Sequence, residues 1–336
     1  MRGPVDYRRI AATIGVDARA IPRIIAAAEG SWARLCAARI RLAELDAPPG
    51  IAAFALGSFG RGEAGDASDL DLALLYFDGR CPAAAAGAHR AAVSAALREV
   101  GFDVPDKTFD RALDVGALVR DIGGRLDHND HLTHRALVLT EGAWLHAAAA
   151  AREIQDALFQ AYAGGTIGRG RFLSALSNDL HRYYRTVTVD YRFKVEVAGK
   201  GWALRNLKLR HSRKLWHLAN LILFAWAAQV DDDVRDAVIA AHLGEPPLAR
   251  LAAGMTALGA PERCAPLFVA YDRFLAGIAG ADARAELESL AHDARDASAT
   301  YVSLRDNADR FDDAAAAIVA HLWESKPEHL IRFGLL

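Results

Sequence analysis

This chain has little cysteine and no long hydrophobic run. The three cysteines, Cys36, Cys81 and Cys264, are far apart and lack C-x-x-C spacing, so neither a disulfide framework nor a zinc site is implied. No apolar run reaches the roughly 20 residues of a transmembrane helix, and the first residues contain no signal-peptide core. We therefore expect a cytoplasmic protein with no membrane partner.

The composition is that of a globular protein. Apolar residues make up 52% of the 336 residues and charged residues 24%. This length accommodates about two domains, each with a core of its own. The formal net charge of −2 does not by itself indicate a class of partner.

The hydrophobic pattern predicts an α+β fold in three parts. Residues 1–48 have helical spacing of apolar residues, a small mixed β-sheet domain with packed helices covers 49–163, and an all-α domain covers 167–336. Residues 163–166 are the predicted hinge between the last two parts. Within the sheet domain we expect strands at 51–56, 70–77, 101–104 and 112–118, and helices at 83–100 and 144–162.

One stretch of the sheet domain combines two features of nucleotide chemistry. The first predicted strand ends abruptly at Gly57 and Ser58, where a tight backbone turn and a hydroxyl can approach phosphate. Asp69 and Asp71 begin the second strand and, being two residues apart, face the same side. Two carboxylates that lie close together repel each other unless they share a cation. The stretch therefore predicts a phosphate-binding corner beside a metal site.

The same residues carry a family resemblance. The two segments are Gly57-Ser58-Phe59-Gly60-Arg61-Gly62-Glu63 and Ser68-Asp69-Leu70-Asp71-Leu72. Together they resemble the signature of the DNA polymerase beta superfamily of nucleotidyltransferases. The fuller pattern is most similar to the amino-terminal domain of PII-protein uridylyltransferases and related nucleotidyltransferases. The resemblance covers roughly residues 50–162 and identifies 49–163 as the catalytic domain.

A site of this type needs a third carboxylate on a neighbouring strand. Asp103, Asp106, Asp110 and Asp114 are available. We choose Asp114, because Leu113-Asp114-Val115-Gly116 resembles a Leu-Glu-Val-Gly segment of the uridylyltransferase relatives. Asp110 is the alternative, since it lies at an equally plausible strand start.

Two histidine-containing segments invite a metal interpretation. His128, His131 and His134 are three residues apart, which is a spacing that drifts around a helix, and no H-E-x-x-H motif accompanies them. We interpret them as the polar start of a helix. His292 and Asp293 form the dipeptide found in phosphohydrolase metal sites, but no further ligands accompany it, and we attribute it to chance.

The charge is concentrated in a basic block at residues 169–214. It contains twelve Lys or Arg and three acidic residues, whereas residues 215–336 contain ten basic and eighteen acidic residues. Aromatic and apolar residues are interleaved, as in amphipathic helices. The block could supply phosphate ligands, bind RNA such as a tRNA end, or form a solvated face paired with the acidic carboxy-terminal third.

These observations predict a metal-dependent nucleotidyltransferase. The resemblance implies that Asp69, Asp71 and Asp114 hold Mg²⁺ or Mn²⁺ as catalytic ligands, with an NTP as substrate and pyrophosphate as product. The predicted phosphate-binding residues are Gly57, Ser58, Arg61, Arg205 and Lys208. Arg61 is also expected to fix the loop by pairing with Glu63. A protein side chain is the favoured acceptor and RNA the second; the alternative is a non-catalytic, nucleotide-binding regulatory or interaction protein.

Overall fold

The structure, a computed structural model, describes residues 3–105, 109–164, 173–199 and 201–325. The chain divides into two compact units. Unit 1 comprises residues 1–4, 28–179 and 240–246, and unit 2 comprises residues 5–27, 180–239 and 247–336. The α+β class is confirmed, because a small mixed sheet lies in unit 1 and the described part of unit 2 is helical.

The described residues of unit 1 form one four-stranded sheet in the order β3-β2-β1-β4. The strands are β1 (Ile51–Leu56), β2 (Asp71–Tyr76), β3 (Ala112–Asp114) and β4 (Ala143–His146). Strand β1 is antiparallel to both β2 and β4, whereas β2 and β3 are parallel. The register pairs Leu56 with Asp71, so the end of β1 lies beside the start of β2.

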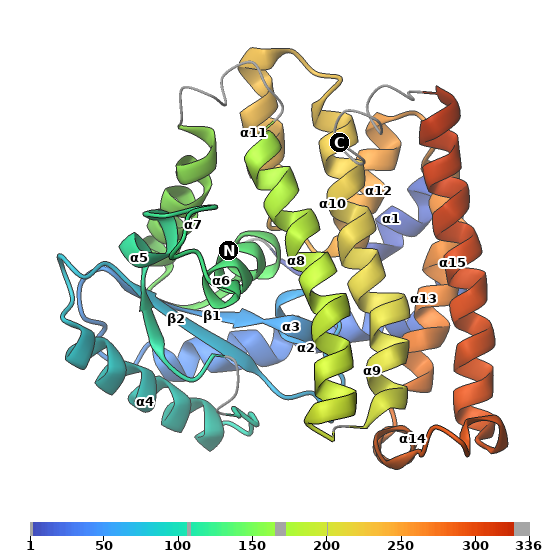
Figure 1. The fold of residues 1–336 in the computed structure, drawn as a ribbon, viewed down its shortest axis with the longest axis horizontal. Coiled ribbons are helices and arrows are strands. Elements are labelled where there is room, and N and C mark those ends of the chain that lie inside the picture. The colour runs from blue at the N-terminus through green and yellow to red at the C-terminus, as the bar shows by residue number, and fades with distance from the viewer. Residues whose placement is uncertain (1–2, 106–108, 165–172, 200, 326–336) are drawn as a thin grey trace. The chain divides into compact units, whose positions relative to one another are not determined.

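Helices cover both faces of this sheet (Figure 1). Ala53, Ala55, Leu72 and Leu74 point to one face, where they form a core with residues of α2 and α4. Helices α6 and α7 contact β1 on the other face. The helices of unit 1 are the later part of α2 (Pro22–Leu42), α3 (Gly57–Gly60), α4 (Ala83–Glu99), α5 (Val115–Val119), α6 (Asn129–Glu141), α7 (Ala148–Ala163) and the start of α8 (Ser174–Arg192).

Three predicted elements differ from the structure. Residues 101–104 form no strand. The strand predicted at 112–118 ends at Asp114, because the Asp114 carboxylate accepts a hydrogen bond from the Ala117 N–H (2.9 Å) and caps α5. The helix predicted at 144–162 begins later, because residues 143–146 pair with β1 as the edge strand β4. The predicted hinge at 163–166 extends into residues outside the described part of the chain.

Unit 2 is built of helices packed around aromatic and aliphatic side chains. It contains α1 (Tyr7–Thr13), the start of α2, the rest of α8, α9 (Trp202–Lys208), α10 (Lys214–Ala227), most of α11 (Asp232–His242), α12 (Pro247–Ala257), α13 (Ala265–Gly277), α14 (Ala281–Ser289) and α15 (Ala299–Ser325). Two π-helical segments, Phe193–Val197 and Leu209–Arg213, extend α8 and join α9 to α10. Asp272 on α13 accepts hydrogen bonds from the N–H groups of Arg23 and Ile24, and so satisfies the first turn of α2.

Within the described residues, no single helix has both the length and the apolar composition needed to cross a membrane. One bent pair, Pro261–Gly277 with Ala281–Ser289, meets that test only when its two helices are taken together.

Candidate functional site

The chain turns sharply after β1, at the corner formed by Gly57 and Ser58. Gly57 has φ of +64°, a left-handed conformation that favours glycine. A Cβ atom at this position would overlap the Asp71 carboxylate oxygen Oδ2. The corner and the start of β2 are therefore in direct contact, and only glycine permits that approach. Ser58 follows as a half-buried residue in the short helix α3.

Asp71 lies on the face of the sheet that carries α6, and Asp69 lies two residues before β2 begins. The intervening Leu70 and the following Leu72 are buried in the core on the opposite face. Asp69 and Asp71 are half-buried. Because side chains alternate along an extended chain, Asp69 is expected to project to the same side as Asp71. The structure thus brings Asp71 to the corner that the sequence singles out, and the place of Asp69 beside it stays a prediction.

The corner is fixed by a carboxylate that sequence reasoning missed. The Glu141 side chain, with 0% exposure, accepts hydrogen bonds from the Gly57 N–H (2.9 Å) and from Arg61 Nη1 (2.8 Å). At Gly60, a Cβ atom would overlap the Glu141 carbonyl oxygen. The sequence did contain a signal for Glu141, namely its place at the end of the apolar run in α6, because an isolated buried carboxylate requires partners.

Arg61 has the loop-fixing role expected of it. Its Nε donates to Glu63 Oε1 (2.5 Å), which confirms the predicted ion pair, and its guanidinium also binds Glu141. The Arg61 side chain is only 7% exposed. Arg61 and the Gly57 N–H are both engaged by carboxylates, so the geometry lends no support to phosphate binding by Arg61 or by the Gly57 amide. Ser58 is the corner residue left for phosphate.

The strand register separates Asp114 from Asp71. Asp114 pairs with Tyr76 at the opposite end of β2 from Asp71. Its carboxylate accepts hydrogen bonds from the N–H groups of Asp78 (3.1 Å) and Ala117. The structure therefore does not bring Asp114 to the acidic pair. Because β3 runs parallel to β2, Asp110 lies before β3 at the end that corresponds to Asp71.

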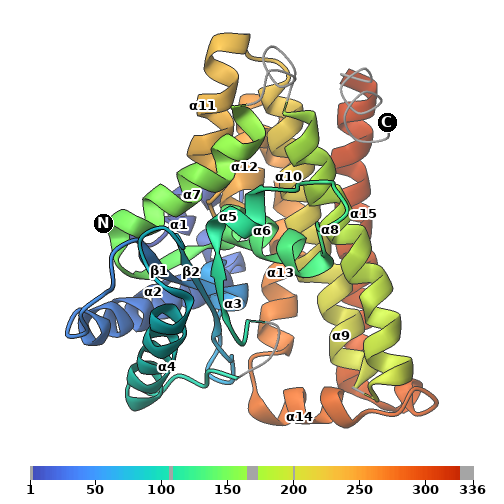
Figure 2. The same cartoon turned by 60° about the vertical axis from the view of Figure 1, so that its left-hand side comes forward.

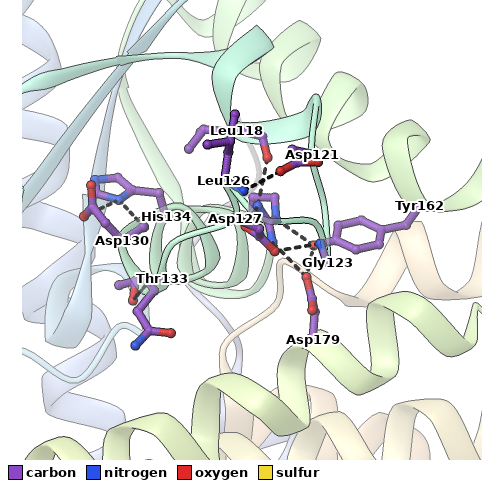
Figure 3. A network of polar contacts seen from close by, with 12 residues as sticks. Leu118, Asp121, Gly123, Leu126, Asp127, Asp130, Thr133, His134, Tyr162 and Asp179 are labelled. Atoms are coloured by element: carbon purple, nitrogen blue, oxygen red, sulfur yellow. Dashed lines mark hydrogen bonds and ion pairs between the residues drawn. The ribbon is translucent and has the colours of Figure 1, made fainter.

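Helix α6, which carries Glu141, is held by a buried polar network around Arg135 (Figure 3). Arg135 donates to both carboxylate oxygens of Asp127 (2.7 and 2.9 Å) and to Asp179 Oδ2 (2.9 Å). Its Nε donates to the Tyr162 hydroxyl (2.8 Å), and that hydroxyl donates to Asp179 (2.6 Å). Burial raises the pKa of Tyr162, with the Asp179 charge adding to the effect. The network ties α6 to α7 and to the start of α8.

The histidine segment is the start of a helix, as predicted. Helix α6 begins at Asn129, with His128 as its N-cap residue. His134 contacts the Asp130 carboxylate (3.3 Å), and its hydrogen bond lowers the pKa of Asp130 to about 2. His292 is engaged by the Trp202 ring and by Arg295 in unit 2.

In the described part of the chain, no group of three His, Cys, Asp or Glu residues could hold a metal ion. Asp106 lies outside that part. The pair Asp69 and Asp71 nevertheless has the oxygen donors that suit Mg²⁺, which commonly binds through one or two carboxylates and completes its shell with water and substrate phosphates. Arg205 and Lys208 are half-buried on α9 in unit 2, and their role as phosphate ligands stays a prediction.

Comparison with known proteins identifies one similarity. Residues 8–109 match the family model described as "Putative nucleotidyltransferase DUF294". The matched segment contains Gly57, Ser58, Asp69 and Asp71, and it ends before Asp110 and Glu141. No curated protein and no solved structure is significantly similar to the chain. The match supports a nucleotidyltransferase family and, in general terms, nucleotidyl transfer.

Proposed function

We propose that unit 1 transfers a nucleotidyl group from an NTP to an acceptor hydroxyl. The observation that carries this proposal is the contact between the corner and Asp71. Gly57 is packed against the Asp71 carboxylate, and Asp69, two residues earlier, is expected to project to the same side. The family match covers these residues and agrees with the proposal.

Asp69 and Asp71 are the proposed ligands of a Mg²⁺ or Mn²⁺ ion. Their half-buried position supports this role, because two like charges held close together are costly without a cation. A bound divalent ion would supply charge neutralisation for the phosphates and the leaving pyrophosphate. A Cβ atom at Gly57 would displace Asp71, so glycine at this position preserves the ligand geometry.

The other groups of the chain would position the substrate and accept a proton. The Ser58 hydroxyl is placed to donate to a phosphate oxygen. We assign the third carboxylate to Asp110 in preference to Asp114, on the register of β3. As the oxygen of the acceptor hydroxyl forms a bond to the α-phosphorus, Asp110 would take the proton of that hydroxyl. The bond from the α-phosphorus to the bridging oxygen then breaks, and pyrophosphate leaves with that electron pair.

The acceptor is proposed from the sequence resemblance. Similarity of the motifs to PII-protein uridylyltransferases favours a hydroxyl on a protein side chain. RNA is the second candidate acceptor, because basic and aromatic residues are interleaved in the block at 169–214.

A non-catalytic nucleotide-binding protein is the alternative function. It is favoured by the separation of Asp114 from Asp71 and by the absence, among the residues that the structure describes, of a three-ligand metal group. Such a protein would bind NTP and Mg²⁺ without releasing pyrophosphate.

Pyrophosphate release from each NTP, with Mg²⁺ and a cell lysate as acceptor source, tests the proposal. Treating the lysate with protease or with ribonuclease beforehand distinguishes protein from RNA acceptors. We expect release by the unaltered protein and background release by the Asp69→Asn variant. The exposed Asp78 follows β2 at its other end, so Asp78→Asn is the matched control. NTP binding with no release under any of these conditions would establish the non-catalytic alternative.

A further inference from the structure

In unit 2, helix α8 runs antiparallel to the segment formed by α9 and α10 (Figures 1 and 2). The Tyr183 and Trp216 rings meet edge-on at 5.1 Å, and Tyr184 stacks on His217 at 4.2 Å. Further along, the side chain of Tyr191 lies near Asn206 and Arg205. Later residues of α8 thus meet earlier residues of α9 and α10. We term these facing sides the α8–α10 seam, defined by Tyr184, Arg185, Tyr191, Arg205, Arg213 and His217.

Four cations of the basic block have acidic partners. The ion pairs are Arg210 with Asp309 (2.6 Å), Lys214 with Asp312 (2.6 Å), Arg192 with Glu196 (2.7 Å) and Lys194 with Asp190 (2.5 Å). Two of these pairs join the basic block to acidic residues of α15 in the carboxy-terminal third. These four cations therefore agree with the interpretation of the basic block as a face paired with acidic residues. None of the four needs a ligand to balance its charge.

Three arginines of the seam differ from these four. No ion pair of Arg185, Arg205 or Arg213 is found among the described residues. Arg205 Nε and Arg213 Nη1 are buried and have no hydrogen-bond partner there. A buried donor left without an acceptor costs about 1–3 kcal/mol. Arg205 and Arg213 thus each keep one buried donor without a partner, and the exposed Arg185 lacks the acidic partner that Arg192 has on the same helix.

The centre of the seam is aromatic and uncharged. Burial lowers the pKa of His217 to about 3, and the nearby His181 and Arg185 lower it further, so that His217 is neutral at pH 7. Arg185 directly follows Tyr184, which belongs to the stack with His217. Arginine beside flat aromatic rings is typical of surfaces that bind nucleic-acid strands.

The spacing of the arginines suits a chain of anions. Arg205 and Arg213 are roughly two helical turns apart, on the order of 12 Å along the axis. One phosphate group cannot bridge that distance, whereas successive phosphates of a strand can. Phe193, 57% exposed, lies in the π-helical segment at the end of α8, and a second π-helical segment ends at Arg213. Such segments are frequent at functional sites.

We propose that the α8–α10 seam binds single-stranded nucleic acid, with Arg185, Arg205 and Arg213 contacting successive phosphates and Phe193 stacking on a base. The interleaved aromatic rings favour a nucleic-acid strand over an acidic peptide, which offers charge but no planar bases. This binding is independent of the transfer activity proposed for unit 1, and each can fail without the other.

Fluorescence anisotropy with a labelled RNA of about 12 nucleotides, without secondary structure, tests the proposal on the full chain. We expect the Arg185→Ala, Arg213→Ala double variant to bind about tenfold or more weakly than the unaltered protein. The slope of log affinity against log salt should fall by about 1.4, because each single-strand phosphate contact contributes about 0.7. The corresponding double lysine variant should retain most of the slope, since lysine also neutralises phosphate.

Arg305→Ala is the matched control, because Arg305 is a half-exposed cation of the same unit already paired with Asp296 (2.7 Å). It should leave RNA affinity within about twofold, and thermal unfolding should show all variants folded. No binding by the unaltered protein would overturn the proposal. An equal loss with Arg305→Ala would also overturn it, as would equally strong competition by a polyglutamate peptide.

Discussion

The buried Glu141 carboxylate accepts a hydrogen bond from the backbone N–H of Gly57, although the two residues are 84 positions apart. Helix α6 thereby fixes the corner that contacts Asp71. The residues of the family match end at 109, so the proposed site depends on a side chain beyond the matched segment. This dependence can be measured.

Replacing Glu141 with glutamine should destabilise the protein and weaken nucleotide binding. The amide keeps the shape but loses the charge that binds Arg61, and a hydrogen bond to a charged group contributes about 2 kcal/mol. Urea unfolding measures the loss. Glu153→Gln is the control, because Glu153 pairs with Arg80 at an exposed position, where the loss of the pair should change the free energy of unfolding little. Equal effects of the two variants would contradict the role given to Glu141.

Alanine at Gly57 should abolish activity, whereas alanine at Gly62 should not. Both glycines have positive φ, 64° and 68°, so both variants carry a backbone cost of about 1–2 kcal/mol. At Gly57 the added Cβ would also overlap the Asp71 carboxylate, whereas at Gly62 no atom lies within 4 Å. Pyrophosphate release is compared between the variants at the same folded fraction. This comparison separates the backbone cost, which both variants share, from the overlap with Asp71, which only Gly57→Ala has. Full activity of Gly57→Ala would show that Asp71 does not need its observed position.

The two candidates for the third carboxylate give opposite expectations. Asp110→Asn should abolish transfer with little effect on stability, because Asp110 is exposed. Asp114→Asn should leave transfer nearly unchanged, since asparagine caps helices about as well as aspartate and can retain the bond from the Ala117 N–H. Loss of transfer in Asp114→Asn alone would restore the assignment made from the sequence resemblance.

Strand β1 was predictable to the residue, while β3 and β4 were not. Prolines and Gly50 precede β1 and Gly57 follows it, so local chemistry sets both of its ends. Strand β4 is short and runs into the alanine-rich α7, and its pairing with β1 is a long-range contact that local pattern does not contain. Strand β3 stops where the side chain of Asp114 turns to cap α5.

Asp69 and Asp71 could be recognised in the sequence, because residues two apart on an extended chain lie on one face whatever the rest of the fold. The third carboxylate could not be identified in this way, because its position depends on the register between β2 and β3. The partners of Glu141 could not be predicted either, since Gly57 and Arg61 lie in a distant segment of the chain. In the basic block, charge counts could not separate Arg210, which has acidic partners, from Arg213.

Unit 2 should lose stability as the pH falls below about 6.5. His211 is fully buried: its Nδ1–H donates to the Leu207 carbonyl (2.9 Å), and its Nε2 accepts from Asn307 (3.1 Å). Burial lowers the pKa of His211 to about 4 from its ordinary value of 6.5. The unfolded chain therefore binds a proton between these two pH values that the folded chain does not, so stability decreases as pH decreases.

Between pH 7 and pH 5 the His211 contribution to this loss should be about 2 kcal/mol, at about 1.4 kcal/mol per pH unit below 6.5. The His211→Gln variant should lose less stability than the unaltered protein over this interval by that amount, whatever its stability at pH 7. Urea unfolding at the two pH values gives both differences. An unchanged pH dependence in the variant would show that His211 does not titrate as described.

Electron paramagnetic resonance of Mn²⁺, recorded with a non-hydrolysable NTP analogue, tests most directly whether Asp69 and Asp71 hold a divalent ion beside the Gly57 corner. The account predicts that the analogue promotes Mn²⁺ binding to the unaltered protein and to Asp78→Asn. It also predicts that Asp71→Asn weakens this binding by at least about tenfold while the protein stays folded. Mn²⁺ binding of equal strength in Asp71→Asn and Asp78→Asn would contradict the account.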